Sequence, residues 1–184
     1  MKRLFDVLVS GTAIVVLSPL LVVISLFIYL QDRGPIFFKQ QRFGLGGKLF
    51  YIMKFRTMIV GAEKKGSYFT KDNDSRITVL GKFLRKTSLD ELPQLLNVLK
   101  GDMSLVGPRP DVPEQKQLYS QKEWEFRCSV RPGITGLAQA TLRSQATIEE
   151  RKCMDLQYVK NRTFLLDLKI ITMTLKQIIT KGGN

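Results

Sequence analysis

Two adjacent carboxylates, Asp90 and Glu91, are the residues of this chain best suited to chemistry. They stand just before Pro93, at the expected start of an amphipathic helix, in a chain without histidine. The absence of histidine excludes a His general base, a Ser-His-Asp triad and an HExxH zinc site. If the chain is an enzyme, its chemistry must come from carboxylates, Lys and Arg, with or without a metal ion.

The acidic pair also has a purely structural interpretation. Ser88 and Glu91 have the spacing of a capping box, and the helix dipole favours acidic residues in a first turn. Taken alone, the stretch fits helix capping better than catalysis. The two interpretations are compatible, because a helix N-terminus and neighbouring cations also favour the ionised form of Asp90.

Composition narrows the class of partner. The chain has 184 residues, which fits one domain, and its 29 Lys and Arg against 16 Asp and Glu give a net charge of +13. Such a charge implies nucleic acid, an anionic membrane surface or a phosphorylated small molecule as partner. Cys128 and Cys153 show neither metal-ligand spacing nor a disulfide framework, which favours a reducing compartment.

The N-terminal segment predicts membrane association. Val7 to Leu30 is a run of 24 residues without a charge, long enough for a transmembrane helix. A signal peptide is less favoured, because the run is too long and no small-x-small cleavage pattern follows. A buried helix of a soluble protein is the other alternative.

Two features argue against a simple span. Ser18-Pro19 lies at the midpoint of the run, and each half is only about 17 Å long as a helix. Basic residues flank both ends of the run, so both ends prefer the cytoplasmic face. A re-entrant helix bent at Ser18-Pro19 fits both facts, with the Ser18 hydroxyl satisfying a backbone group freed by the proline. These arguments leave re-entrant and spanning topologies equally open.

Further elements must position the acidic pair. Ile36–Gln40 and Lys48–Met58 read as the strands of a hairpin, in which alternation places Lys54 and Arg56 on one face. That face suits a phosphate site or simply solvent. Residues 61–75 read as a surface loop, followed by a short helix over Leu80–Arg85 and a second helix from about Leu92 to Lys100.

The C-terminal half alternates rigid turns with helices. Gly107-Pro108-Arg109-Pro110 presents Arg109 from a stiff backbone, which suits phosphate recognition, and Arg131 to Gly136 reads as another turn. Thr147 opens a helix with capping-box spacing that runs to about Lys160. A last apolar helix from Phe164 to about Thr180 can pack on the core or lie in a membrane interface.

Seven stretches together resemble one family. They are Ser18-Pro19, Lys54-Phe55-Arg56-Thr57-Met58, Arg85 to Gln94, Leu99 to Ser104, Gly107 to Pro110, Arg131 to Gly136 and Leu166-Asp167-Leu168-Lys169. In this order they resemble the bacterial sugar transferases, the monotopic polyprenyl-phosphate phosphoglycosyl transferases. The resemblance covers nearly the whole chain and suggests a minimal member that consists of the catalytic core.

The resemblance implies an α+β fold. Residues 1–30 would form the re-entrant helix, and residues 31–184 a mainly helical, cytosolic and membrane-associated catalytic domain with a small β-hairpin and interfacial amphipathic helices. It also implies transfer of a sugar 1-phosphate from a UDP-sugar to undecaprenyl phosphate with release of UMP. The active site would lie on the cytoplasmic face of the bacterial inner membrane, among anionic lipids, and would need Mg²⁺.

The resemblance further assigns roles to residues. Asp90 matches the nucleophilic aspartate and Glu91 its dyad partner. The pair would bind the metal, and for Glu91 the alternative role is to orient the incoming polyprenyl phosphate. Lys54, Arg85, Arg109 and Asp167 match positions associated with the site, while Arg56 and Arg131 are further candidates for phosphate contact. Resemblance is weakest at residues 111–126 and 140–152, where sugar choice would be set.

Two other classes fit the composition. One is a membrane-anchored nucleic-acid-binding protein, although the chain shows no helix-turn-helix, zinc or RNP-like pattern. The other is a structural protein of the membrane surface, anchored by the last helix. The resemblance favours the enzyme, without nucleic acid as a partner. The sugar, the glycan pathway and any homo-oligomer are not specified by the sequence.

Overall fold

The computed structural model describes residues 1–62, 74–142 and 147–181. Most of the predicted surface loop, residues 63–73, therefore lies outside the described residues. The helices and strands of the described ranges follow in chain order: α1 (Lys2–Asp32), β1 (Phe37–Phe43), β2 (Leu49–Phe55), α2 (Val79–Lys86), α3 (Gln94–Lys100), β3 (Ser104–Val106), α4 (Gln121–Arg127), β4 (Gly133–Thr135), α5 (Leu137–Thr141), α6 (Ile148–Asn161) and α7 (Phe164–Lys181). The predicted α+β class is confirmed.

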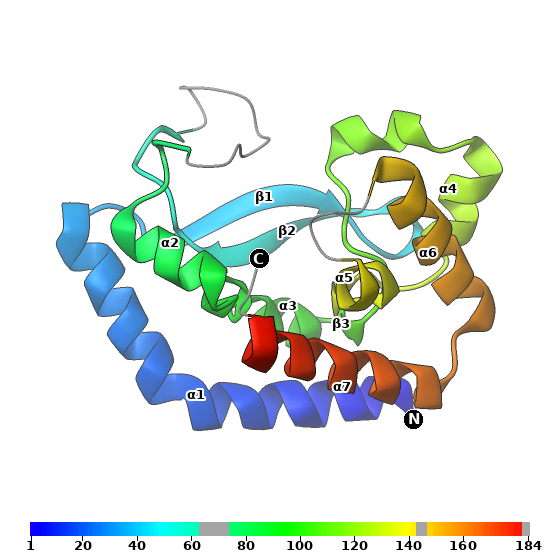
Figure 1. Cartoon of the computed structure of the whole chain (residues 1–184), viewed down its shortest axis with the longest axis horizontal. Helices are drawn as coiled ribbons and strands as arrows, with labels where there is room; N and C mark the ends of the chain where they lie inside the picture. Colours follow the sequence, from blue (N-terminus) through cyan, green and yellow to red (C-terminus); the bar gives the residue numbers. More distant parts are fainter. Residues whose placement is uncertain (63–73, 143–146, 182–184) are drawn as a thin grey trace.

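The N-terminal apolar run forms one long helix, α1, with Pro19 inside it. Figure 1 shows this helix bending about halfway along its length. Pro19 has no N–H, so the carbonyl of Val15 loses its helical donor. The Ser18 hydroxyl donates to that carbonyl at 2.8 Å, as expected from the sequence. Among the described helices, α1 is the one whose length and composition would allow it to cross a membrane.

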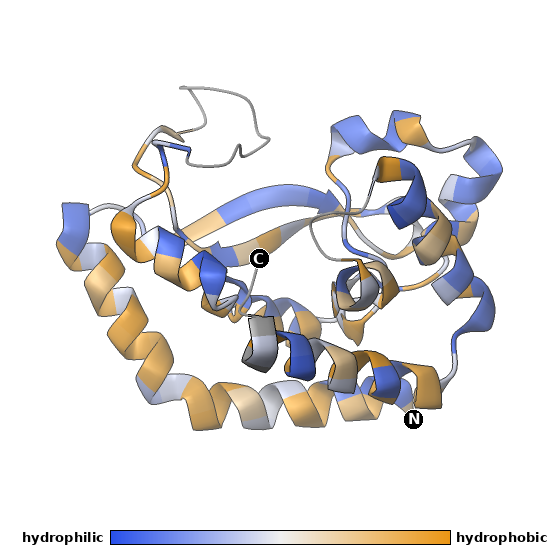
Figure 2. Cartoon of the chain, in the orientation of Figure 1, coloured by the Kyte–Doolittle hydropathy of each residue, from blue (hydrophilic) through white to orange (hydrophobic). Residues whose placement is uncertain are grey.

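Both ends of α1 are attached to the rest of the chain, and its middle is not. At the N-terminal end, Lys2 donates to the carbonyl of Val106 and Arg3 to the carbonyls of Val98 and Leu99. At the other end, buried side chains form one hydrophobic cluster: Ile24, Ile28, Phe55 and Leu84. Away from these contacts the helix exposes large apolar side chains, and Figure 2 shows this part of it as mainly hydrophobic: Val15, Val16, Leu20, Val22, Val23, Leu26 and Phe27.

The described residues form two small sheets. β1 and β2 pair antiparallel from Phe37 opposite Phe55 to Phe43 opposite Leu49, which confirms the predicted hairpin. The second sheet corrects the prediction of a plain turn over Arg131 to Gly136, because Gly133–Thr135 is strand β4 and pairs parallel with β3. Strands of three residues are too short to leave a periodic pattern, so no pattern of residues predicts them.

Glycines allow the second sheet to form. A Cβ on Gly133 would lie 2.1 Å from the backbone nitrogen of Gly107, and a Cβ on Gly107 would lie 2.3 Å from the carbonyl oxygen of Arg131. No side chain fits such an approach of two backbones. The two glycine-containing motifs, far apart in sequence, are therefore packed against each other.

The predicted helices α2, α3, α6 and α7 are present, and the Thr147–Glu150 capping box opens α6 as expected. The short helices α4 and α5 were not predicted, because segments of seven and five residues carry little periodicity. Two further core clusters join these elements. Ile52 of β2 packs with Val98 and Met103 around α3, and Val106 of β3 packs with side chains of α5, α6 and α7.

Candidate active site

Asp90 and Glu91 lie in a single 3-10 turn, Leu89–Glu91, between α2 and α3. The turn begins at Ser88, whose φ of 57° places it in the left-handed region. The Ser88 side chain makes no capping hydrogen bond, so the capping-box prediction is wrong. Because the left-handed residue reverses the chain after α2, the two carboxylates come immediately before α3, as the sequence suggested.

Glu91 is held by two cations from different elements. Its Oε1 accepts a hydrogen bond from Lys54 Nζ at 2.6 Å and another from Arg109 Nη2 at 3.1 Å. Burial alone would raise the pKa of Glu91, but Lys54 and Arg109 outweigh that effect and hold the pKa at about 2. Glu91 is therefore a fixed negative charge at any physiological pH.

Asp90 has a different environment, although it is the adjacent residue. Its side chain is buried, with 8 % of the residue exposed, and within the described chain it forms no hydrogen bond or ion pair. Burial raises the pKa of Asp90 to about 6, against the opposing influence of Lys54, Arg85 and Arg109. As expected, the neighbouring cations lower the pKa of Asp90. Burial raises it by more, so the expectation of a net preference for the ionised form is wrong. Above pH 7, Asp90 is an ionised and weakly solvated carboxylate.

The position of Lys54 relative to Glu91 is set by Asn97. Asn97, on α3, accepts a hydrogen bond from the backbone N–H of Met53 at 3.0 Å and donates to the carbonyl of Tyr51 at 2.8 Å. These bonds fasten α3 to the edge of β2, the strand that carries Lys54. Sequence reasoning missed Asn97. An amide in a leucine-rich helix was the available signal, since a buried amide needs partners.

Arg109 lies in a segment, Pro108 to Asp111, in which each backbone carbonyl group accepts a hydrogen bond. Gly133 N donates to the carbonyl of Pro108, Arg127 to that of Arg109, Arg42 to that of Pro110, and Phe43 N to that of Asp111, at 2.6 to 3.0 Å. The segment is not helical, as its prolines predicted. The backbone of Arg109 is therefore fixed from several sides.

Arg127 is the most buried of these supports. Its guanidinium contacts Asp155 at 2.8 Å and Asp111 at 2.9 Å, in addition to the Arg109 carbonyl, and all three side chains are buried. Sequence reasoning did not single out Arg127 or Asp155. Their partners lie on separate elements, so spacing along the chain carried no signal.

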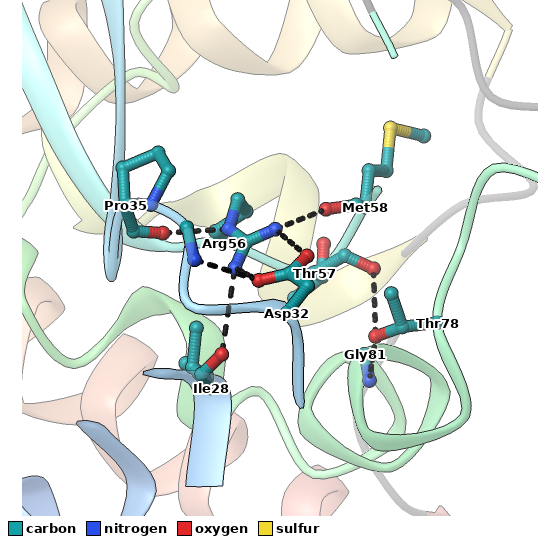
Figure 3. Close-up of polar contacts among 9 residues, drawn as sticks. Ile28, Asp32, Pro35, Arg56, Thr57, Met58, Thr78 and Gly81 are labelled. Atoms are coloured by element: carbon teal, nitrogen blue, oxygen red, sulfur yellow. Dashed lines mark hydrogen bonds and ion pairs between the residues drawn. The ribbon is translucent and has the colours of Figure 1, made fainter. Parts of the chain in front are cut away.

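Three of the predicted site residues are engaged away from Glu91. The guanidinium of Arg56 binds the carboxylate of Asp32 at the end of α1 and the carbonyl of Pro35 (Figure 3). Arg131 donates to the carbonyl of Gly101, and Asp167 binds Lys2 and the hydroxyl of Tyr158. Lys54 and Arg56 thus serve different partners, contrary to the prediction of one shared face, because β2 ends at Phe55.

Arg85 completes the positive surroundings of Asp90. It stands in the last turn of α2, donates to the Thr57 hydroxyl at 2.9 Å, and burial lowers its pKa. Lys54, Arg85, Arg109 and the two carboxylates thus form one charged cluster, with Asp90 lacking a direct partner in the part of the chain described. A buried carboxylate with cations around it suits attack on, or binding of, a phosphorylated substrate.

A cavity of about 180 Å³ lies beside this cluster. Glu91, Arg109 and Ser88 line it on one side, and Leu92, Leu95, Ile134 and Ile178 contribute apolar walls. The cluster therefore borders a cavity whose walls are in part apolar.

Comparison with known proteins identifies the family. The chain is 43% identical to the uncharacterized sugar transferase EpsL of Bacillus subtilis over 100% of this chain and 89% of that protein. It is 39% identical to the exopolysaccharide production protein ExoY of Sinorhizobium fredii, over 100% of this chain and 87% of that protein. It is 42% identical to the UDP-glucose:undecaprenyl-phosphate glucose-1-phosphate transferase of Klebsiella pneumoniae, over 99% of this chain but 41% of that protein. With the family description "Bacterial sugar transferase" matching residues 1–181, the chain belongs to the bacterial sugar transferase family.

Proposed function

We propose that the protein transfers a sugar 1-phosphate from a UDP-sugar to undecaprenyl phosphate, releasing UMP, as the first membrane step in the synthesis of an exopolysaccharide or related glycan. The observation that carries this proposal is the charged cluster: buried Asp90 lies beside Glu91, which Lys54 and Arg109 hold. Three similar proteins are named for such transfers: two names give a UDP-sugar together with undecaprenyl phosphate, and the third gives undecaprenyl phosphate and galactose.

The cluster supports a covalent first step. Asp90 attacks the β-phosphorus of the UDP-sugar, the new bond forms to a carboxylate oxygen, and the bond from the β-phosphorus to the bridging oxygen of UMP breaks. In the second step an oxygen of undecaprenyl phosphate attacks the same phosphorus and displaces the Asp90 carboxylate. No net proton is gained or lost at the carboxylate, provided that Asp90 is ionised at the start, as its pKa of about 6 allows near neutral pH.

The neighbouring residues have separate tasks. Arg109, Lys54 and Arg85 offset the charge of the pyrophosphate, which otherwise repels an anionic nucleophile. Glu91 keeps Lys54 and Arg109 in place, while its other oxygen, Oε2, makes no hydrogen bond within the described ranges. Arg56 and Asp167 fasten the two ends of α1 to the domain and so support the site from a distance.

Mg²⁺ fits the donor set. No group of three acidic or cysteine side chains that could hold a metal ion occurs among the described residues. Mg²⁺, however, is often bound by one or two carboxylates together with substrate phosphates, and Asp90 and Glu91 offer two. Asp90 and Glu91 would hold the ion, which supplies charge neutralisation at the transferred phosphoryl group.

We also infer that α1 enters the membrane and returns, with the active site on the cytoplasmic face. Lys2 and Asp32, at opposite ends of α1, both contact the one catalytic domain. The exposed apolar side chains lie between these attachments. A helix that crossed the bilayer would have its two ends about 30 Å of hydrocarbon apart, which separates one attachment from the domain.

The direct test is detection of the intermediate. The protein in detergent or a nanodisc is incubated with a UDP-sugar and Mg²⁺ but no acceptor, and intact-protein and peptide mass spectrometry follow. We expect release of one equivalent of UMP and a sugar-phosphate adduct on Asp90. Addition of undecaprenyl phosphate should discharge the adduct into the lipid product.

Variants separate the parts of the proposal. Asp90→Asn should give no adduct and lose at least about 10³-fold in turnover, since the nucleophile is removed. UMP release by wild type without any adduct would contradict the covalent step but not the overall transfer. Chelation with EDTA should abolish turnover, and Mg²⁺ should restore it. Failure of every UDP-sugar in a panel would reject the proposed function itself.

A further inference from the structure

We propose that the cavity beside Glu91 and Arg109 holds the phosphate-proximal isoprene unit of the lipid acceptor, and that Ile178 is a specificity-determining residue for that lipid. This inference rests on the proposed function, because it names the place where one of the two substrates binds. It is carried by three features of the cavity: its lining, an unpartnered amide and its junction with the apolar surface of α7.

The lining matches the head of a polyprenyl phosphate. At one side stands Arg109, a phosphate-binding side chain, and the remaining walls include Leu92, Leu95, Ile134 and Ile178. A cavity of about 150 Å³ can hold a benzene ring, so the volume of about 180 Å³ found here accommodates roughly one five-carbon isoprene unit. The geometry places an anionic head and the start of an apolar chain side by side.

A buried amide indicates a polar ligand atom near Arg109. Gln139, on α5, lines the cavity, and both its Oε1 and its Nε2 are buried without a hydrogen-bond partner in the described chain. Leaving such atoms unpaired is costly, so a partner is expected. A phosphate oxygen can accept a hydrogen bond from Nε2 while Arg109 neutralises its charge.

The cavity meets the apolar surface of α7 at Ile178. Leu168, Leu175 and Ile178 are exposed and, at spacings of seven and three residues, fall on one face of the helix. Of these three, Ile178 alone also lines the cavity. A prenyl chain lying along this face of α7 can therefore enter the cavity without leaving apolar surroundings.

The sugar of the UDP-sugar is a poorer occupant. Thr135, Gln139 and Thr174 also line the cavity and offer hydrogen bonds to a sugar, but hydroxyl groups that face Leu92, Leu95, Ile134 and Ile178 would be buried without one, which is disfavoured. An isoprene unit has no such groups to satisfy. The chemistry of the walls therefore favours the lipid.

The test compares two substitutions on the same helix. Ile178→Trp narrows the cavity, whereas Leu165→Trp changes an exposed apolar residue of the same helix that is none of these three face residues and does not line the cavity. In nanodiscs, initial rates of UMP release are measured while undecaprenyl phosphate and the UDP-sugar are varied separately. We expect Ile178→Trp to raise the KM for undecaprenyl phosphate about tenfold or more, with Leu165→Trp close to wild type.

The outcomes distinguish this inference from the proposed function. Equal acceptor KM values for the two variants, in an enzyme whose wild type is active, would overturn the inference and leave the proposed function intact. A change confined to the KM for the UDP-sugar would place the sugar in the cavity and also overturn it. An inactive wild type would reject the proposed function instead.

A second variant covers the case in which Ile178→Trp does not fold. Gln139→Met keeps the side-chain volume and removes two unpartnered polar atoms, so the unliganded protein should be at least as stable as wild type. If Gln139 donates to the acceptor phosphate, the KM for undecaprenyl phosphate rises about fivefold or more while the thermal midpoint does not fall. An unchanged acceptor KM in this variant would contradict the inference.

Discussion

At the scale of single residues, Asp90 and Glu91 show how two adjacent carboxylates acquire opposite properties. Burial without a direct partner raises the pKa of Asp90, whereas Lys54 and Arg109 overcome burial and lower that of Glu91. Pairs of carboxylates driven apart in this way commonly divide a reaction between them. Here Asp90 is a weakly solvated carboxylate, as suits the nucleophile proposed above, and Glu91 is a fixed anion that orders the cations.

The same contrast predicts opposite effects on stability. The folded-state pKa of Asp90, about 6, lies above its ordinary value of 3.8, so its ionisation destabilises the fold as the pH rises through that window. Asp90→Asn should therefore stabilise the protein by about 1 to 3 kcal/mol at pH 8 and have little effect below pH 4. Thermal unfolding midpoints in detergent at the two pH values measure this.

Glu91→Gln is expected to have the opposite effect on stability. Its folded-state pKa of about 2 lies below the ordinary 4.5, so its stabilising effect is complete above pH 4.5 and is lost as the pH falls toward 2. At pH 8 this variant should lose about 1 to 3 kcal/mol, because Lys54 and Arg109 become unpaired. If both variants moved the midpoint in the same direction at pH 8, the assigned environments would be incorrect.

At the scale of elements, the sequence predicted those with a strong periodic or capping signal. Helices α2, α3, α6 and α7 and the β1–β2 hairpin were predicted from apolar spacing and turn residues. β3, β4, α4 and α5 were not, because segments of three to seven residues are fixed by tertiary contacts rather than by local preference. The left-handed conformation of Ser88 was not predicted for a related reason. The spacing of Ser88 and Glu91 predicted a capping box, but the reversal of the chain after α2 sets the φ angle of Ser88.

The site was predicted in part for the same physical reason. Asp90, Glu91, Lys54 and Arg109 were marked by charge and by the motifs around them. Asn97 and Arg127 position them through buried hydrogen bonds to backbone groups of distant segments. Such contacts depend on which carbonyl lies nearby in the fold, and neither residue type nor spacing encodes that.

The bracing of Arg109 by Arg127 can be tested with Arg127→Lys. A single ammonium keeps the charge but cannot serve Asp155, Asp111 and the carbonyl of Arg109 together. We expect turnover to fall about 10- to 100-fold at a temperature where the variant is fully folded, because Arg109 is displaced. Lys152→Met is the control, since Lys152 pairs with Glu123 across the same helices, α4 and α6, near the surface. If turnover of Arg127→Lys stayed within twofold of wild type, Arg127 would stabilise the fold without positioning Arg109 for the reaction.

The bend of α1 offers a double-mutant cycle. In the Pro19 background, Ser18→Ala leaves the carbonyl of Val15 without a donor in apolar surroundings, which should cost about 1 to 3 kcal/mol. In a Pro19→Ala background the backbone N–H of residue 19 returns, and the same Ser18→Ala change should be nearly neutral. Unfolding in mixed micelles measures the coupling energy, and additivity of the two changes would show that the hydroxyl does not replace the lost donor.

At the scale of the whole molecule, the long apolar helix α1 is attached at both ends to the domain that carries the charged cluster. The cluster of Phe55 and Leu84 with Ile24 and Ile28 lies close in sequence to Lys54 and Arg85, which surround Asp90. At the other end of α1, Lys2 contacts Val106 and Arg3 contacts Val98, on the strand and helix that flank Arg109 and Glu91. Helix α1 thus borders the charged cluster from two directions, and if α1 enters the membrane as proposed, the cluster lies at the level of the lipid head groups.

This arrangement predicts that both ends of α1 lie on the cytoplasmic side. Cys128 and Cys153 are free thiols and are first replaced by serine. One reporter cysteine is then placed in an N-terminal extension and, in a separate protein, another as Lys39→Cys on the exposed edge of β1. A charged maleimide should label neither in intact spheroplasts and both after lysis, because the hydrogen bonds of Lys2 and Arg3 keep the N-terminus against the domain. If the N-terminal reporter alone were labelled in intact spheroplasts, α1 would span the bilayer, and those contacts could not exist in the membrane-bound protein.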